Sequence, residues 1–351
     1  MAQSNNERKV VVVIGATGLQ GGSVVRTLSE ARHKYIIRGL SRDVSSSKAQ
    51  ALSKMGIEMR KVDLDDPESF HDAFEGAQII FAMTDFWQTM SAAREEAQGK
   101  SIMDIAADLP DLEQMIWADL PDAARISGGK YINVHHWQSK AAISDYIRVE
   151  KPDLWKKTTT VLFPNYFENC LTNPADVREN QQPDGTYQRS FVLPEETLLP
   201  NVAISDTGKL VQYIIEHPDL CISKTIAFYS QAISEGAKIQ SMVSGKQSRS
   251  VARTNFRSRY DSGTTDLLAP AYNIDVRYNL VSSKEFQSNL KKTMDDVTAL
   301  DFTEQLLIFR DFGQIYGRSE FVQVSQLPGL ELMTWEAFLA ANNLLSYMTS
   351  K

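Results

Sequence analysis

Residues 10–23 read VVVVIGATGLQGGS, an unbroken apolar run that ends in a glycine-rich turn. Such a run predicts a strand of a parallel sheet that is covered by helices on both faces. Gly15 permits a tight turn after the strand, Gly18 lets backbone N–H groups approach a pyrophosphate, and Gly21 allows the following helix to pack closely. The start of that helix adds free N–H donors and the positive end of a dipole. Because the glycines stand between a strand and a helix, they predict a dinucleotide-binding loop.

The rest of the first half continues this alternation of β-rich and helical stretches. After the strand at 10–14 and the helix at 19–30, we expect strands at 35–40, 58–62, 78–83, 114–118 and 158–163. Helices are expected between them, at 48–54, 67–74, 92–108 and 140–149. Alternation of this kind is typical of βαβ units. It predicts an α/β fold in which residues 1–164 form a doubly wound parallel Rossmann sheet.

The second half, residues 165–351, has a less regular pattern and predicts a smaller C-terminal α+β lobe that completes a cleft. We expect a helix that begins at Ser205 or Asp206 and ends near Pro218, and then a strand at 224–229 on the main sheet. Two amphipathic helices are expected near 303–312 and 334–343. Residues 247–275, which are rich in Ser and Arg, are interpreted as an exposed insertion.

Composition excludes several classes of protein. A formal charge of −7 argues against a nucleic-acid binder that works by neutralising phosphates. No apolar run reaches the roughly 18 residues that a membrane span needs, and residues 1–9 lack the apolar stretch of a signal peptide. Two cysteines, Cys170 and Cys221, do not make a disulfide scaffold. We therefore expect a protein of the cytosol or nucleus that binds neither nucleic acid directly nor a membrane.

The end of the second expected strand indicates which dinucleotide binds. An NAD site usually places Asp or Glu there, to accept hydrogen bonds from the ribose hydroxyls. This chain has Ser41 and Arg42 instead, a hydroxyl and a guanidinium suited to a 2′-phosphate, and Lys48 adds a second positive charge. These residues favour NADP(H) over NAD(H). A counter-argument is that the neighbouring Asp43 offers Arg42 a competing ion pair.

Two further polar residues follow expected strands at the edge where open α/β sheets bind ligands. Asp63 comes after the third strand and is a candidate for contacting an adenine, and Thr84 comes after the fourth. Each is equally well explained as a helix cap or a turn former.

Several segments together resemble the NmrA-like family, an atypical branch of the short-chain dehydrogenase/reductase superfamily, and most of all its HSCARG-type NADPH sensors. They are the glycine loop at 15–24, DLDD at 63–66, TDFW at 84–87, QGK at 98–100, PNYFEN at 164–169 and SDTG at 205–208. The resemblance implies NADP(H) contacts at Gly15, Gly18, Gly21, Arg42, Asp63, Thr84 and Lys140. To these we add, as candidate cofactor contacts, Thr17, Leu19, Gln20, Ser41, Lys48, Leu64, Tyr166 and Phe167.

The usual catalytic residues of that superfamily are incomplete here. Its typical members use a Ser, and a Tyr and a Lys in the spacing Tyr-x-x-x-Lys on one helix, to move a proton and hold the nicotinamide ribose. Lys140 has the place of the Lys, but His136 stands four residues before it and Ala118 stands where the Ser is expected. His136 with Lys140 is a possible substitute pair. We favour the interpretation that His135 and His136 lie in a loop and do no chemistry, and they lack the partners of a metal site.

Lys140 remains the better-supported candidate catalytic residue. In the resembled family some reductases of plant phenolics use a single Lys as general base, and the alternative is that Lys140 only holds the ribose. The aromatic residues Phe86, Trp87, Tyr166 and Phe167 are candidates for the lining of the nicotinamide end of the cleft, or they fill the core.

Two functions are compatible with this pattern. The favoured one is a redox-responsive regulator, in which NADP(H) alters the lobe or a dimer and thereby gates a protein partner; in the resembled family such partners include transcription factors. The missing Ser and Tyr motivate it. The alternative is an NADPH-dependent oxidoreductase that reduces a small aromatic or carbonyl metabolite and uses Lys140. The sequence is compatible with a monomer or a homodimer.

Overall fold

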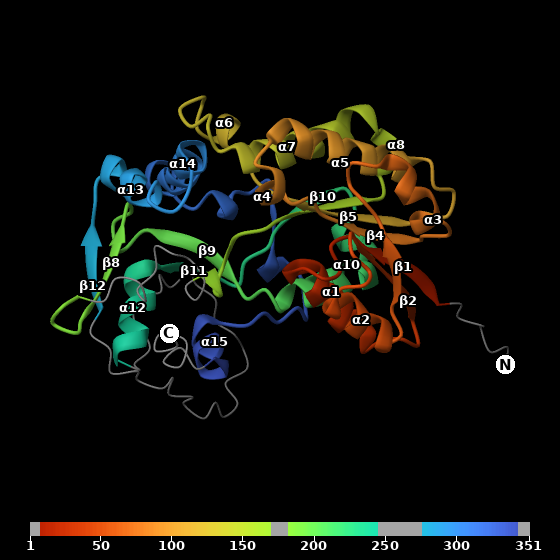
Figure 1. Ribbon diagram of the computed structural model, residues 1–351, viewed down its shortest axis with the longest axis horizontal. Coiled ribbons are helices and arrows are strands. Elements are labelled where there is room, and N and C mark those ends of the chain that lie inside the picture. Colours follow the sequence, from red (N-terminus) through yellow and green to blue (C-terminus); the bar gives the residue numbers. More distant parts are fainter. Residues whose placement is uncertain (1–7, 170–181, 245–275, 343–351) are drawn as a thin grey trace.

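The computed structural model describes residues 8–169, 182–244 and 276–342 (Figure 1). Its main sheet contains β1 (Lys9–Val13), β2 (Tyr35–Ser41), β3 (Glu58–Lys61), β4 (Ile79–Ala82), β5 (Gln114–Asp119), β6 (Thr158–Leu162), β10 (Lys224–Ala227) and β13 (Val322–Gln323). The eight strands are ordered β13-β10-β6-β5-β4-β1-β2-β3. All the pairings among them are parallel. The doubly wound parallel sheet is therefore confirmed, including the return of the chain to it at β10.

Helices cover both faces of this sheet. One face carries α1 (Leu19–Ser29), α2 (Ser47–Lys54), α10 (Asp206–Glu216) and α11 (Pro218–Cys221). The other carries η1 (Pro67–Phe70), α3 (His71–Phe74), α5 (Ala92–Ala107), α7 (His135–Glu150) and α8 (Pro152–Trp155). Successive strand residues supply the two cores, because side chains alternate between the faces of a strand. Val11 and Val13 pack against α1 and α10, while Val12 packs against α5 and α7.

The second half of the chain also builds a smaller lobe. Its strands are β7 (Asn165–Tyr166), β9 (Leu198–Val202) and β11 (Gln231–Ser234) in one sheet, and β8 (Tyr187–Phe191) and β12 (Val276–Leu280) in another. Its helices are α12 (Glu235–Ser244), α13 (Ser283–Leu290), α14 (Asp296–Phe312) and α15 (Trp335–Ala341). Short elements α4 (Phe86–Thr89), α6 (Ala123–Ile126), η3 (Ile315–Gly317) and η4 (Val324–Gln326) complete the description. The predicted insertion at 247–275 lies outside the described residues.

Two helices begin earlier than their patterns predict. Helix α7 starts five residues before position 140, because Trp137 in its first turn is buried against Phe309 of the lobe, with ring centroids 6.1 Å apart. Helix α14 starts seven residues before position 303, where the Asp295 carboxylate accepts hydrogen bonds from the Val297 and Thr298 N–H groups at 2.9 and 3.0 Å. Both extensions matter for function, because they add residues that face the region between sheet and lobe.

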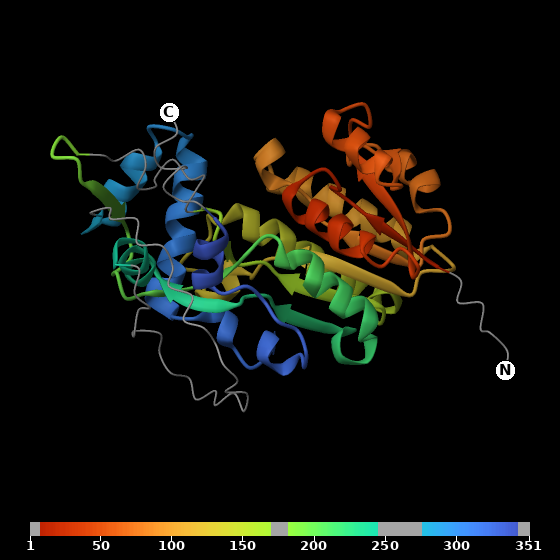
Figure 2. The ribbon, with the colours of Figure 1, turned by 90° about the horizontal axis from the view of Figure 1, so that it is seen from below.

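The lobe lies beside the edge of the main sheet at which the parallel strands of that sheet end (Figures 1 and 2). In both views the strands at the centre of the sheet end on the side nearer to α13 and α14. The carboxyl ends of the strands therefore face the lobe. Of the helices in the described ranges, none is both long and apolar enough to cross a membrane.

Candidate functional site

A cleft of about 670 Å³ lies at the carboxyl edge of the main sheet. One wall comes from the glycine loop and the ends of strands, and includes Gly18 and Thr84. The opposite wall comes from α14 of the lobe, with Phe302 and Phe309. Open α/β sheets bind their ligands at this edge, and the lobe adds the second wall of the cleft.

The glycine loop forms a close backbone cradle at one end of the cleft. Gly15 has φ of +71°, a conformation that favours glycine. A Cβ at Gly21 would lie only 2.3 Å from the Gly15 carbonyl oxygen, so α1 packs directly on the turn. Gln20 donates from Nε2 to the Tyr166 hydroxyl at 2.5 Å, and its Oε1 is buried with no partner among the described residues. With Leu19 exposed at the start of α1, this cradle fits a dinucleotide, whose phosphates and ribose hydroxyls need such partners.

The end of β2 adjoins that loop. The Oγ atom of Ser41 lies 3.5 Å from Oγ1 of Thr17. The Asp43 carboxylate accepts hydrogen bonds from the backbone N–H and the hydroxyl of Ser45, at 2.8 and 2.6 Å, and does not engage Arg42. Arg42 is exposed and forms no ion pair with any residue in the described ranges. Its guanidinium therefore has no competing anion among the described residues, and Lys48 on α2 is exposed as well.

The candidate adenine contacts follow β3. Asp63 is exposed, and its Oδ1 accepts a hydrogen bond from the Asp65 N–H at 3.1 Å. It thus forms a turn, the alternative role that the sequence left open, and its exposed edge is still available to a ligand. Leu64 is half-buried against the core on the α5 face.

Lys140 lies in the cleft wall and makes three hydrogen bonds. Its Nζ donates to the Thr84 carbonyl at 2.8 Å, to Thr84 Oγ1 at 2.9 Å and to Glu95 Oε1 at 2.8 Å. Glu95 is fully buried and also accepts from the hydroxyls of Thr84 and Ser139. Burial raises the pKa of Glu95, but the Lys140 charge and these hydrogen bonds outweigh it and hold the pKa below its ordinary value. Sequence reasoning missed Glu95, because it stands among other charged residues of α5.

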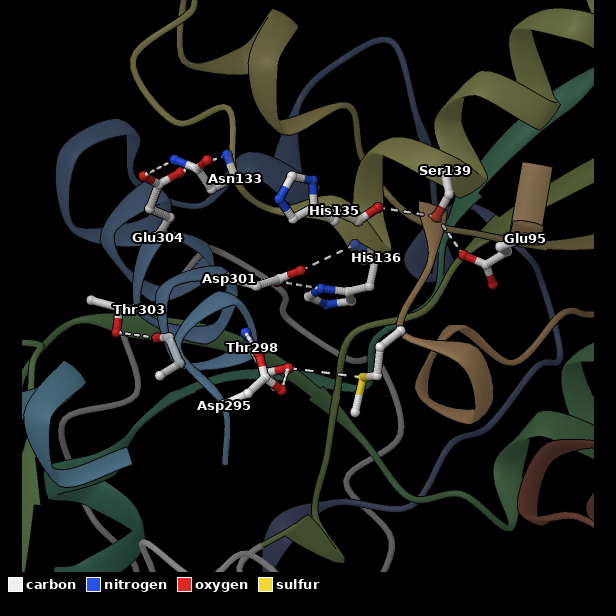
Figure 3. Close-up of polar contacts among 12 residues, drawn as sticks. Glu95, Asn133, His135, His136, Ser139, Asp295, Thr298, Asp301, Thr303 and Glu304 are labelled. Atoms are coloured by element: carbon white, nitrogen blue, oxygen red, sulfur yellow. Dashed lines mark hydrogen bonds and ion pairs between the residues drawn. The ribbon is translucent and has the colours of Figure 1, made fainter. Parts of the chain in front are cut away.

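His136 is brought to the cleft by the first turn of α7. Its Nδ1 lies 2.5 Å from Oδ1 of Asp301 on α14, and its backbone N–H donates to Asp301 Oδ2 at 3.2 Å (Figure 3). The His136 side chain lines the cleft, and no residue in the described ranges hydrogen-bonds to its Nε2. The expected loop position of His135 and His136 is therefore wrong, because tertiary packing extends the helix to His135.

Asp301 was not among the predicted residues. It is 1% exposed, on a helix whose predicted start lay two residues beyond it. A buried carboxylate needs a partner. If the helix had been assigned in full, an Asp on its apolar face would have indicated a polar partner across the cleft. Asp301 and His136 form a dyad in which a carboxylate fixes one ring nitrogen and leaves the other toward the cleft.

Aromatic rings surround the dyad. Trp87 stacks on Phe302 of α14, with centroids 4.9 Å apart and an interplanar angle of 6°, and lies 4.8 Å from the His136 ring. Phe86 and Tyr166 also line the cleft. Phe167 does not: it is fully buried in the lobe, against Trp335 and Phe338. Its side chain fills the core, so the cofactor contact expected of it is not supported by its position.

A second buried acid lies at the end of β5. Asp119 lines the cleft beside Ala118, and its carboxylate accepts hydrogen bonds from the Ser144 hydroxyl at 2.5 Å and the Leu120 N–H at 2.8 Å. Burial raises its pKa to about 7, against the opposing effect of those hydrogen bonds. The site thus holds a carboxyl group whose pKa lies above its ordinary value because of burial.

Comparison with known proteins agrees with this architecture. The sequence pattern of the NmrA-like family matches residues 7–339. An NmrA-like family domain-containing protein of Dictyostelium discoideum is 25% identical over 300 residues, which are 81% of this chain and 97% of that protein. The NmrA-like oxidoreductase FrzB of Cladobotryum sp is 30% identical over 166 residues, 46% of this chain and 48% of its own length. This chain thus spans about half of the latter relative.

Solved structures share the fold across nearly the whole chain. The negative transcriptional regulator NmrA in complex with NAD has a TM-score of 0.66 at 17% identity, over 95% of both chains. The NADPH-dependent quinone oxidoreductase QOR2 of Escherichia coli, complexed with NADPH, has a TM-score of 0.65 at 14% identity, over 95% of this chain and 99% of its own. At these identities the likeness shows the NAD(P)-binding fold.

Proposed function

This chain belongs to the NmrA-like family, and we propose that it is an NADP(H)-dependent reductase of carbonyl compounds. The observation that carries the proposal is the dyad of His136 and Asp301, with Nδ1 and Oδ1 2.5 Å apart at the wall of the cleft. His136 occupies the first position of a His-x-x-x-Lys spacing, where related dehydrogenases have the Tyr that moves the proton. The dyad supplies an acid–base group at that place.

The cofactor end of the proposal rests on the glycine loop, whose Gly18, Leu19 and Gln20 line the cleft, and on the adjoining end of β2. The turn at Gly15 and Gly21 fits a pyrophosphate, and Arg42, which has no ion pair with a described residue, fits a 2′-phosphate together with Ser41. NADP(H) is therefore the proposed cofactor. The glycine loop and the dyad lie along one cleft, so a dinucleotide held by its phosphates at one end can extend toward His136.

The proposed reaction needs one hydride and one proton for each carbonyl group. When bound, a reduced nicotinamide supplies the hydride for the carbonyl carbon. His136 donates the proton from Nε2 to the carbonyl oxygen, which completes the alcohol. Asp301 accepts the hydrogen bond from Nδ1–H, keeps the ring in one orientation and stabilises the imidazolium before the transfer. His136 then regains a proton from water in the cleft.

We assign Lys140 a positioning role instead of the role of general base. A general base needs a neutral amine with a free lone pair, whereas the three donors of a protonated Lys140 are used on Thr84 and Glu95. Those bonds hold the segment after β4, which carries Phe86 and Trp87 into the cleft. Loss of Lys140 would thus alter the shape of the cleft.

The regulatory hypothesis rested on the missing Ser and Tyr. Because the dyad offers another proton donor, that motive no longer applies, and the reductase becomes the preferred function. A response of the lobe to NADP(H), a protein partner and the closer likeness to HSCARG-type sensors remain predictions. If the protein is a redox-responsive regulator, NADP⁺ and NADPH should bind with different affinities or produce different oligomeric states. A ligand with equal affinity for two conformations does not change the equilibrium between them.

The proposal is tested by measuring NADPH oxidation with a panel of aromatic aldehydes and ketones. His136→Phe should lower kcat by about 100-fold or more, since general acid catalysis contributes about 10² to 10⁴. His135→Phe is the matched control, because the His135 side chain forms no hydrogen bond with a described residue, and the bond from the Ser139 hydroxyl is accepted by its backbone carbonyl. If His136→Phe had the same kcat as wild type, the dyad would not take part in the reaction. If wild type turned over none of the compounds, the regulator would again be the preferred function.

A further inference from the structure

A second cavity, of about 100 Å³, adjoins the cleft on the side of the lobe. The two cavities share the lining residues Asn165, Tyr166, Asn169, Met294, Phe302 and Gln305. We call the second cavity the side chamber. Beyond the shared residues its walls come from β8, β9, α12, α13 and α14, so it continues the cleft away from the glycine loop.

A buried lysine lies in the wall of the side chamber. Lys238 of α12 is 6% exposed and donates to Asn201 Oδ1 and Glu235 Oε1, both at 2.8 Å. An ammonium has three donors, so one N–H of Lys238 has no acceptor among the described residues. Burial raises the pKa of Glu235, but Lys238 and Arg189 outweigh that effect and lower the pKa to about 2. The side chamber therefore contains a fixed, charged donor.

Gln305, a residue of both linings, carries a buried acceptor. Oε1 of Gln305 is buried and has no hydrogen-bond partner among the described residues, although Gln305 lines both cavities. Buried polar atoms in native proteins are normally paired, and an exception points to a missing partner. Gln305 follows Asp301 by four residues on α14, so it lies on the same helix face about one turn, roughly 6 Å, from the dyad.

The remaining walls are mainly apolar, with Phe191, Leu199, Phe286, Leu290 and Leu306. An occupant must therefore present an apolar body that ends in one polar group. That group must donate a hydrogen bond to Gln305 and accept one from Lys238. A hydroxyl group does both, whereas an ether or a ketone only accepts.

We propose that the side chamber binds the far end of the substrate, and that this end carries a hydroxyl group held by Lys238 and Gln305. The proposal rests on the proposed function, because it places the reacting carbonyl at His136. The substrate class is then a ring-containing aldehyde or ketone whose hydroxyl group lies about one helical turn, roughly 6 Å, from the carbonyl.

Binding of three matched probes tests this assignment in the wild-type protein. We would measure the Kd of 4-(hydroxymethyl)benzaldehyde, 4-(methoxymethyl)benzaldehyde and 4-methylbenzaldehyde by titration calorimetry without added cofactor, so that neither the aldehyde nor the alcohol group can react. The hydroxymethyl compound should bind about 10-fold more tightly than the other two, the effect of one or two hydrogen bonds to a buried site. Equal Kd values for the three compounds would overturn the proposal. Tighter binding of 4-carboxybenzaldehyde than of the hydroxymethyl compound would overturn the choice of a hydroxyl group.

Substitutions test whether Gln305 and Lys238 cause the preference for the hydroxymethyl compound. Gln305→Leu and Lys238→Met should each reduce the hydroxymethyl preference to about 2-fold or less, because each removes one of the two hydrogen bonds. Gln50→Leu, on the exposed face of α2, should keep it. If wild type reduces the aldehydes but binds all three alike, the side chamber assignment fails alone. If it shows the preference but reduces none of them, the proposed function fails alone.

Discussion

At the scale of single residues, Arg42 carries the proposed choice of cofactor. It is exposed, and Asp43 is engaged with Ser45, so nothing in the described ranges neutralises the guanidinium. We predict that Arg42→Ala weakens NADPH binding by about 10-fold or more and leaves NADH binding unchanged, because only NADPH has a 2′-phosphate for a charge-assisted contact. Fluorescence titration with both cofactors measures this. If the variant lost equal affinity for both, Arg42 would not read the 2′-phosphate.

Asp119 should control how stability depends on pH. Its pKa is raised from 3.8 to about 7 by burial, so the folded state holds the proton more tightly than the unfolded chain does. The stabilisation from this proton is complete below about pH 4 and is lost as the pH rises through about 7. Asp119→Asn keeps a neutral group that can pair with Ser144 and Leu120.

We therefore predict that Asp119→Asn becomes progressively more stable than wild type between pH 4 and pH 7, and that the difference then levels off. A shift of about three pKa units sets an upper limit of about 4 kcal/mol. Urea unfolding across this pH range measures the free energy of unfolding of both proteins. A stability difference that does not change with pH would contradict the assignment.

At the scale of elements, α5 and α7 are joined by the ion pair of Glu95 and Lys140. Breaking a buried pair leaves an uncompensated charge, which costs about 3–5 kcal/mol, whereas replacing both partners is often nearly neutral. Lys140→Met should therefore destabilise the fold by that amount, and the double variant Lys140→Met with Glu95→Gln should recover most of it. Equal free energies of unfolding for the single and double variants would show that Glu95 is not held as a charge by Lys140.

The elements also show which parts of the structure the sequence could predict. The glycine loop and seven strands of the main sheet have short, local patterns, and their positions agree with the prediction to within a few residues, whereas the two-residue strand β13 was not predicted. The start of α7 does not agree with the prediction, because Trp137 gains its partner Phe309 only in the folded molecule. The start of α14 does not either, although the capping residue Asp295 is a local signal that lay outside the predicted helix. A residue pair 165 positions apart, such as His136 and Asp301, leaves no periodic signal in a single sequence.

At the scale of the whole molecule, both halves of the chain contribute residues to one site. The main sheet and its helices provide the glycine loop and His136, and the lobe provides Asp301, Gln305 and Lys238. The sequence predicted a lobe that completes a cleft, but it did not identify the polar residues that the lobe contributes from α12 and α14. The lobe thus orients the dyad as well as enclosing the cleft.

The central claim is that the lobe, through Asp301, makes His136 a proton donor for carbonyl reduction. The most direct test is the kcat of Asp301→Asn for reduction of an aromatic aldehyde at saturating NADPH, with Asp296→Asn at the exposed start of the same helix as control. We predict that Asp301→Asn lowers kcat by about 100-fold with little change in the Kd of NADPH, because the amide no longer fixes the ring or stabilises its charge. A wild-type kcat for Asp301→Asn would contradict the account.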